Sequence, residues 1–335
     1  MPLPHTPATP HPAPRTTAVR RHVRRGVGTA ACAVSLLASA PSLVGAVAGP
    51  PVPIQTPGPA AIRPLLPGPR VAPQWPNPEP WAGAPAAMLV TSLPTDSAGD
   101  MAQIAWFRAS RTQLALYPGT SNPGPGPFAR GPEKVPPAGR AKLVATFNAG
   151  FYEKDSPAGF YVNATLYHPM LRGLATVVGD ANGHVSIVSW TGGKRPGPGV
   201  LVARQNLPLL VENGRVAPRV NASPAWGLTL GGAPAVWRSA LGIDGNGNLI
   251  YAAAPDQTAP SLARLMVHAG AVSAMELDIN PAWPILTSFG GPEAARPSLV
   301  VSNPNQIATR FLVPSAKDFF AIYLQTTIGL APEPF

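Results

Sequence analysis

The sequence predicts an α+β fold, in which a largely antiparallel or mixed sheet built from hairpins packs against one or two helices. Three observations lead to this fold class. From about residue 86, short apolar runs alternate with Gly, Asn and Asp turn signals; three of these turns have the composition of tight hairpins; and one amphipathic segment carries helix signals at both ends.

The first quarter of the 335-residue chain differs from the rest, because 20 of the 46 prolines lie before residue 86. Residues 1–48 combine an arginine-rich stretch with an uncharged apolar run that ends in Ala46-Val47-Ala48, as signal peptides do. We predict cleavage after Ala48, by the Sec or the twin-arginine route, and a secreted or cell-envelope location. An uncleaved membrane anchor is the alternative, since the apolar run is about long enough to cross a bilayer.

Proline at nearly every third position predicts an extended linker over residues 49–85. A folded domain over residues 86–328 and a tail over residues 329–335 then complete the chain. No stable membrane span is expected once the signal peptide is removed.

Composition excludes several kinds of chemistry. The single cysteine, Cys32, lies in the apolar N-terminal run, so the folded part has no thiol for a disulfide, a metal or a nucleophile. Five arginines before residue 49 supply half of the formal net charge of +10, and the remaining excess is scattered. We therefore predict no nucleic-acid partner. Dinucleotide, phosphate-loop and zinc-protease motifs are missing, and we predict no cofactor and no metal.

The individual elements follow from turn and capping residues. Asn-Gly supports the positive φ angles of tight hairpins, and three such turns separate apolar runs, at residues 181–183, 213–214 and 245–247. A helix is predicted over residues 260–269, with Thr258 as its cap and Gly270 just after its end. The run DFFAIYLQ at 318–325 predicts a buried strand.

The segment AMELDIN, residues 274–280, carries the densest group of polar candidates. Side chains alternate across a strand, so Glu276, Asp278 and Asn280 should face one way and the apolar residues between them the other. Two carboxylates at this spacing suit divided acid and base roles. The alternative is a solvent-facing strand whose carboxylates pair with arginines elsewhere.

The segment TFNAGFY, residues 146–152, predicts a buried strand that ends at Asn148, whose amide can donate and accept hydrogen bonds together. Gly150 would let the backbone approach whatever Asn148 faces. The alternative is an ordinary strand-to-turn motif.

Arg238 begins a further apolar strand, so its charge should face either a carboxylate or the surface. It would bind a phosphate if it shared a cleft with Glu276 and Asp278, and would otherwise form a structural salt bridge. His168, in a polar loop, is the one histidine considered for substrate binding.

Four segments, in this order, resemble the phosphodiester glycosidase family. The resemblance covers about residues 140–290 and rests on TFNAGFY (146–152), QNLPLLVENGRV (205–216), WRSALGIDGNGNLI (237–250) and SLARLMVHAGAVSAMELD (261–278). The chain departs from the family after Asp278, where Ile279-Asn280-Pro281 replaces Gly-Gly. That change alters the backbone freedom of the pocket.

The resemblance implies an exported hydrolase that acts on a glycosyl phosphodiester, with cell-envelope glycans as the expected substrates. It carries over Asn148 to orient the sugar, Arg238 to bind phosphate and Asp278 as base or charge stabiliser. Glu276 as second catalytic carboxylate and Asn280 as substrate ligand come from strand alternation alone. The rival prediction is a non-catalytic glycan-binding domain of the same fold, in which Trp226, Trp237 and Trp283 stack on sugar rings; the alternative for each tryptophan is a place in the core.

Overall fold

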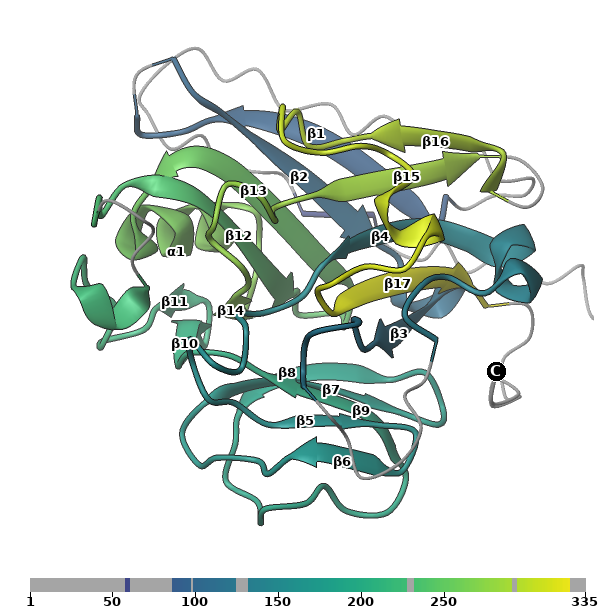
Figure 1. Ribbon diagram of the computed structural model, residues 1–335. Coiled ribbons are helices and arrows are strands. Elements are labelled where there is room, and N and C mark those ends of the chain that lie inside the picture. The colour runs from purple at the N-terminus through teal and green to yellow at the C-terminus, as the bar shows by residue number, and fades with distance from the viewer. Residues whose placement is uncertain are drawn as a thin grey trace, which may run out of the picture. The chain divides into compact units, whose positions relative to one another are not determined.

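The computed structural model describes residues 58–60, 86–97, 99–124, 132–227, 232–290 and 294–325. The predicted signal peptide, most of the predicted linker and the predicted tail lie outside these residues. The described part consists mostly of antiparallel sheets with few helices, and Figure 1 shows three sheets. None of the described helices is long and apolar enough to cross a membrane.

The largest sheet has seven strands, and all of its neighbouring pairs are antiparallel. In spatial order the strands are β1 (Met88–Pro94), β2 (Met101–Phe107), β13 (Leu249–Gln257), β12 (Val236–Ile243), β14 (Ser273–Glu276), β10 (Leu209–Glu212) and β11 (Arg215–Val216). The hairpins predicted around residues 213–214 and 245–247 are confirmed as β10–β11 and β12–β13. Gly214 and Gly247 take positive φ angles of 71° and 84°, as such turns require.

Two five-stranded sheets complete the described part. The first contains β16 (Arg296–Leu299), β15 (Leu286–Gly290), β4 (Leu143–Asn148), β17 (Phe319–Leu324) and β3 (Thr112–Tyr117). The second contains β6 (Thr165–His168), β5 (Phe160–Val162), β9 (Val200–Gln205), β7 (Ala175–Asp180) and β8 (Val185–Ser189). The hairpin around residues 181–183 is confirmed as β7–β8, and the run 318–325 forms the buried strand β17.

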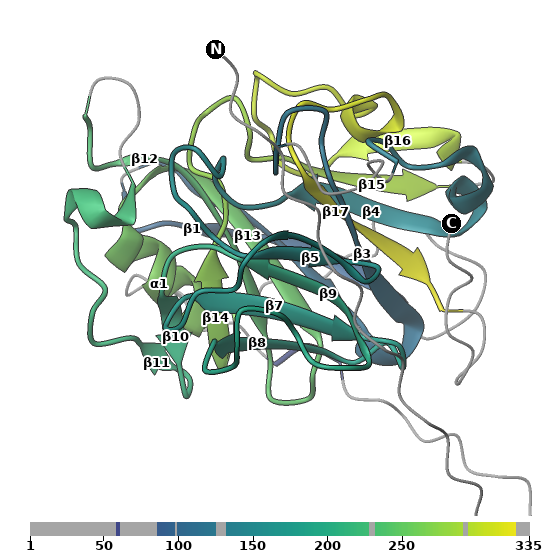
Figure 2. The same cartoon turned by 60° about the horizontal axis from the view of Figure 1, so that its bottom comes forward.

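Helix α1 (Ala259–His268) matches the predicted helix to within one residue at each end. The Thr258 hydroxyl accepts a hydrogen bond from the backbone N–H of Ser261, whose hydroxyl accepts one from the backbone N–H of Thr258. This reciprocal cap satisfies two donors at the helix N-terminus. The apolar face of α1 packs against the seven-stranded sheet (Figure 2). Short 3-10 helices lie at Ala109–Arg111, Pro137–Lys142, Pro224–Trp226 and Arg310–Leu312.

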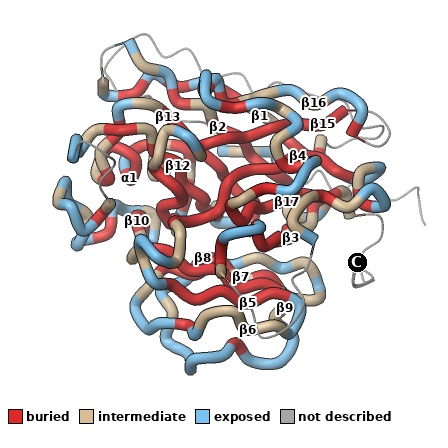
Figure 3. Tube along the Cα trace, viewed as in Figure 1, coloured by how far each residue is buried: buried red, intermediate tan, exposed pale blue. Residues whose placement is uncertain are grey.

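One hydrophobic cluster draws residues from all three sheets, among them Phe107, Phe147, Val177, Met275 and Phe320. Figure 3 shows the strands buried through the middle of the described part and the connecting loops exposed around it. Because this shared core brings the sheets together, the ends of β4 and β14 and the start of β12 become neighbours.

Candidate functional site

Hydrogen bonds join three segments that are far apart in the sequence. The backbone N–H of Asp278 donates to the carbonyl of Ala149 (3.1 Å), just after β4. The N–H of Leu277 donates to the carbonyl of Ser239 in β12 (2.8 Å), and the Ser239 hydroxyl donates to the carbonyl of Asp278 (2.8 Å). The segments predicted to carry the candidate residues are therefore in direct contact.

Asn148 ends β4 and has a fully engaged amide. Its Nδ2 donates to the Ser239 hydroxyl (2.9 Å) and to the carbonyl of Ala149 (3.1 Å). Its Oδ1 accepts from the Tyr251 hydroxyl (2.8 Å) and the backbone N–H of Ile285 (3.1 Å). These four bonds use the full capacity of the amide. Asn148, with 2% of its surface exposed, thus holds the strand ends together.

Arg238 is buried and its guanidinium bonds to four acceptors. Nε donates to the carbonyl of Gln257 (2.8 Å), and Nη2 to the carbonyl of Pro234 (3.1 Å). Nη1 donates to the carbonyl of Trp226 (2.7 Å) and to Oε1 of Glu276 (2.5 Å). Four of the five N–H groups are used in this way. Of the two arrangements predicted for Arg238, the structure shows the ion pair with a carboxylate.

Glu276, the last residue of β14, is the most deeply buried carboxylate of the group, with 0% exposure. Its second oxygen, Oε2, has no hydrogen-bond partner among the described residues. Burial raises the pKa of Glu276 from 4.5 to about 7, and the attraction of Arg238 offsets this only in part. The charge of Asp278 raises the pKa further. The two carboxylates are therefore close enough to interact electrostatically.

Asp278 pairs with Lys317, a residue that the sequence reasoning missed. The Lys317 ammonium donates to Oδ2 of Asp278 and to the carbonyl of Gly150 (2.5 Å), while Oδ1 of Asp278 accepts from the backbone N–H of Asn280 (2.9 Å). Burial raises the pKa of Asp278, and Lys317 acts in the opposite direction. Asp278 has 3% of its surface exposed, slightly more than Glu276.

The strand predicted over 274–280 is shorter in the structure, because β14 ends at Glu276. Beyond it, the N–H of Asp278 bonds across to the β4 end and the N–H of Asn280 to the Asp278 side chain. Pro281 then has no N–H to offer a neighbouring strand. The predicted alternation therefore stops at Glu276, and Glu276 and Asp278 each have a cation of their own. Asn280 forms a turn, in which its side chain accepts from the N–H of Ala282 (3.0 Å).

Gly150 and His168 occupy different surroundings. A Cβ on Gly150 would lie 3.2 Å from both the Arg204 guanidinium and the Asn206 side chain, so glycine permits this close packing. His168 lies at the end of β6, where its Nδ1 is 3.7 Å from Glu153 and its Nε2 contacts the carbonyl of Pro123. These contacts place His168 in a separate cluster from Asp278.

A further buried ion pair, also missed by sequence reasoning, joins Arg204 of β9 to Asp318 (2.8 Å). Asp318 also accepts a hydrogen bond from the Asn122 side chain. The available signal was the pair Lys317-Asp318 directly before the apolar strand β17, since charges adjoining a buried strand need partners.

Two half-buried aromatic rings cover Lys317. Its ammonium lies 4.3 Å from the ring centre of Tyr152 and 5.7 Å from that of Trp283. The rings meet edge to face at 5.8 Å, and the Arg310 guanidinium lies 4.5 Å above Trp283. Tyr152, Trp283 and Arg310 are thus partly exposed residues near the buried Asp278–Lys317 pair.

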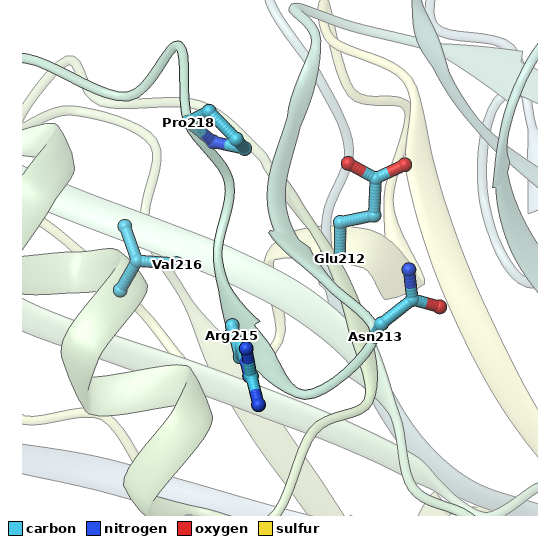
Figure 4. Close-up of a pocket in the computed structure, with 5 residues that line it drawn as sticks. All are labelled: Glu212, Asn213, Arg215, Val216 and Pro218. Atoms are coloured by element: carbon cyan, nitrogen blue, oxygen red, sulfur yellow. The ribbon is translucent and has the colours of Figure 1, made fainter.

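A shallow pocket of about 390 Å³ lies at the β10–β11 hairpin, remote in sequence from these residues (Figure 4). It is lined by Glu212, Asn213, Arg215, Val216 and Pro218. Among the described residues, no group of three or more His, Cys, Asp or Glu side chains is placed to hold a metal ion.

Comparison with known families finds a match over the segment that contains most of the candidate site residues. Residues 141–278 match the phosphodiester glycosidase family. The matched segment includes Asn148, Arg238, Glu276 and Asp278, and the resemblance predicted from the sequence is confirmed there. Lys317, Trp283 and Arg310 lie beyond its end. No curated protein sequence matches the chain.

The solved structures that are similar to this chain include the following three. The N-acetylglucosamine-1-phosphodiester alpha-N-acetylglucosaminidase catalytic domain from zebrafish, auto-inhibited by its pro-peptide, is 14% identical, with 76% of this chain and 88% of that chain covered and a TM-score of 0.46. A Synechocystis protein is 13% identical, with 71% and 62% covered and a TM-score of 0.43. A Burkholderia pseudomallei protein is 13% identical, with 72% and 75% covered and a TM-score of 0.34. The chain thus spans 62% of the Synechocystis protein.

Proposed function

We propose that this protein is an exported hydrolase that cleaves a glycosyl phosphodiester, with glycans of the cell envelope as its substrates. The observation that carries the proposal is the family match over residues 141–278, which contains the candidate residues Asn148, Arg238 and Asp278. The contacts that join these residues within the fold support it. Export rests on the predicted signal peptide.

In the proposed reaction, a water oxygen forms a bond to the anomeric carbon of the sugar, and the bond from that carbon to the phosphate oxygen breaks. The leaving group departs as a phosphate monoester with the bonding electrons, and the water proton passes to a base. Because the departing phosphate is a stabilised anion, it needs little protonation. The main tasks of the protein are therefore to hold the phosphate, stabilise positive charge at the ring and deliver water.

We assign the base or charge-stabilising role to Asp278, because it is paired with Lys317, whose ammonium lies against the half-exposed rings of Tyr152 and Trp283. Its charge interacts with Tyr152, whose pKa is raised by burial and, secondarily, by Asp278. With 3% of its surface exposed, Asp278 meets a substrate only when neighbouring side chains move aside. Burial raises the pKa of Asp278, and Lys317 opposes this rise, since an adjacent cation favours the ionised carboxylate.

Glu276, Arg238 and Asn148 are better suited to positioning. The Arg238 guanidinium bonds mainly to backbone carbonyls and to Glu276, which leaves little capacity for a phosphate. Asn148 reaches Asp278 through the Ser239 hydroxyl, which bonds to the Asp278 carbonyl. In this proposal the three residues fix the backbone that carries Asp278.

A non-catalytic glycan-binding domain is the second candidate. The burial of both carboxylates in ion pairs favours it, as does the Ile279-Asn280-Pro281 sequence in place of the Gly-Gly of the family. Such a domain needs an aromatic surface and no accessible acid. The half-exposed Tyr152 and Trp283 offer that surface.

The experiment is to incubate the purified full chain with alkyl esters of N-acetylglucosamine 1-phosphate and other hexose 1-phosphates, with phosphorus and proton NMR as the readout. We expect free sugar and alkyl phosphate, and at least a 100-fold lower rate for Asp278→Asn. Asp256→Asn, an exposed carboxylate on β13, is the matched control and should keep the full rate. Binding without turnover would support the glycan-binding domain in place of the hydrolase. The absence of both binding and turnover would exclude the two proposed functions.

A further inference from the structure

The loop after Asp278 is held by a second loop. Side chains of residues 303–310 donate to the backbone carbonyls of residues 281–284: Asn303 to Pro281 (2.8 Å) and Pro284 (2.9 Å), and Gln306 to Ala282 (2.6 Å). These bonds fix the segment that directly follows Ile279 and Asn280, the two positions at which the family has its glycines. A loop fixed in this way can present a side chain in one defined position.

That side chain is Trp283. Its ring contacts Tyr152 edge to face, with centroids 5.8 Å apart and planes at 76°. The Arg310 guanidinium lies over Trp283, 4.5 Å from the ring centre, at the distance of a cation–π contact. All three side chains are partly exposed, although their neighbours Asp278 and Lys317 are buried.

The Arg310 guanidinium keeps donors to spare. Its Nη1 donates to Oε1 of Gln306 (2.7 Å) and to the carbonyl of Ala282 (3.3 Å). Nε and Nη2 make no hydrogen bond to any part of the chain that the structure describes. Arg310 therefore differs from Arg238, whose nitrogens are all engaged.

The charges around Arg310 leave it available to an anion. Asp278 interacts with it electrostatically but is paired with Lys317. Lys154 adds an exposed cation, 5.4 Å from the ring centre of Tyr152. The charges of Asp318 and Asp155 also act on Tyr152, but Asp318 is paired with Arg204, and Asp155 is exposed to solvent. A guanidinium anchored on an aromatic ring, with nitrogens uncommitted, suits the planar, two-pronged recognition of a phosphate.

We propose that Arg310, Trp283 and Tyr152 form a binding site for a sugar phosphate, in which Arg310 binds the phosphate and the two rings contact the sugar. The choice of a sugar phosphate as ligand rests on the proposed function. The rings supply apolar surface for the C–H groups of a sugar, and the Tyr152 hydroxyl adds a polar group. In this proposal Arg310, which lies outside the matched segment, binds the phosphate in place of Arg238, which lies inside it.

The test is titration calorimetry of the full chain with N-acetylglucosamine 1-phosphate, a monoester that the proposed reaction does not cleave. Arg310→Gln should weaken binding at least tenfold, and Arg310→Lys should weaken it less. Trp283→Leu should weaken binding of both this ligand and free N-acetylglucosamine. The matched control is Arg195→Gln, which removes an exposed arginine stacked on Tyr161 and should leave binding unchanged.

Thermal unfolding of each variant separates loss of the site from loss of the fold. Failure of the unaltered chain to bind the monoester at millimolar concentration, or equal binding by Arg310→Gln, would overturn this site. Arg310-dependent binding in a protein that hydrolyses no phosphodiester would keep the site and remove the hydrolase. If Arg310→Gln hydrolysed the phosphodiester as fast as the unaltered protein at low substrate concentration, the proposed hydrolase would stand and the Arg310 site would be excluded.

Discussion

Glu276 makes the stability of this fold depend on pH. It is fully buried, its Oε2 has no partner among the described residues, and burial raises its pKa to about 7 against the pull of Arg238. In the unfolded chain the same carboxyl has its ordinary pKa of 4.5. The folded state therefore binds the proton more tightly. This contribution to stability is fully present below pH 4.5 and is lost as the pH rises through about 7.

The replacement Glu276→Gln removes this dependence. The difference between 4.5 and about 7 corresponds to roughly 3 kcal/mol, since one pH unit is worth ~1.36 kcal/mol. Glutamine has nearly the shape of the protonated acid and does not ionise. We expect the free energy of unfolding of Glu276→Gln, relative to that of the unaltered protein, to increase by about 3 kcal/mol between pH 4.5 and pH 8, because only the unaltered protein loses stability over this range.

Urea unfolding followed by tryptophan fluorescence at both pH values measures this difference. The comparison holds if the two proteins give the same m-value, because a change in stability alone leaves that slope unchanged. Glu212→Gln changes an exposed carboxylate on β10 and is the control, for which no such pH-dependent gain is expected. The reasoning would be refuted if Glu276→Gln lost stability relative to the unaltered protein as the pH rose. Attraction by Arg238 would then outweigh burial.

Three further predictions concern single contacts, each measured by urea unfolding at pH 7. Lys317→Met leaves Asp278 buried without its cation and should lower the free energy of unfolding by about 3–5 kcal/mol. The double variant with Asp278→Asn should recover part of this loss. A loss under about 1 kcal/mol for Lys317→Met would contradict the prediction. Gly119→Ala places a Cβ 2.4 Å from backbone atoms and should cost more than about 1 kcal/mol, whereas Gly193→Ala, which meets nothing within 4 Å, should be nearly neutral. Thr258→Ala removes the helix cap and should cost about 1 kcal/mol, while Thr258→Ser should keep most of it; equal losses would argue against the cap.

The secondary-structure elements that were predicted correctly are those whose conformation is set by residues adjacent in the sequence. Asn-Gly turns specify their hairpins because the turn residues themselves adopt positive φ, and all three predicted hairpins are present. Helix α1 was predicted because Thr258 and Gly270 mark its two ends. The prediction failed at the end of AMELDIN, where the β14 strand stops because Asp278 bonds to a different segment.

The partners of the charged residues could not be predicted in this way. Glu276 and Asp278 lie two residues apart, yet their cations come from β12 and from the residue pair before β17. Asn148 was singled out correctly as a strand-ending amide, but the saturation of its hydrogen bonds depends on Ser239, Tyr251 and Ile285.

By itself, the sequence determined the hairpins and the capped helix, since each is encoded in residues that are close together along the chain. It also determined the family resemblance, which depends on four short segments and their order. Only the tertiary structure decided which charges are buried and paired, and that every guanidinium nitrogen of Arg238 is engaged whereas Arg310 donates through Nη1 alone. The physical reason is that the charge state and hydrogen bonds of a side chain depend on what surrounds it. In this fold those surroundings come from segments tens to more than a hundred residues away.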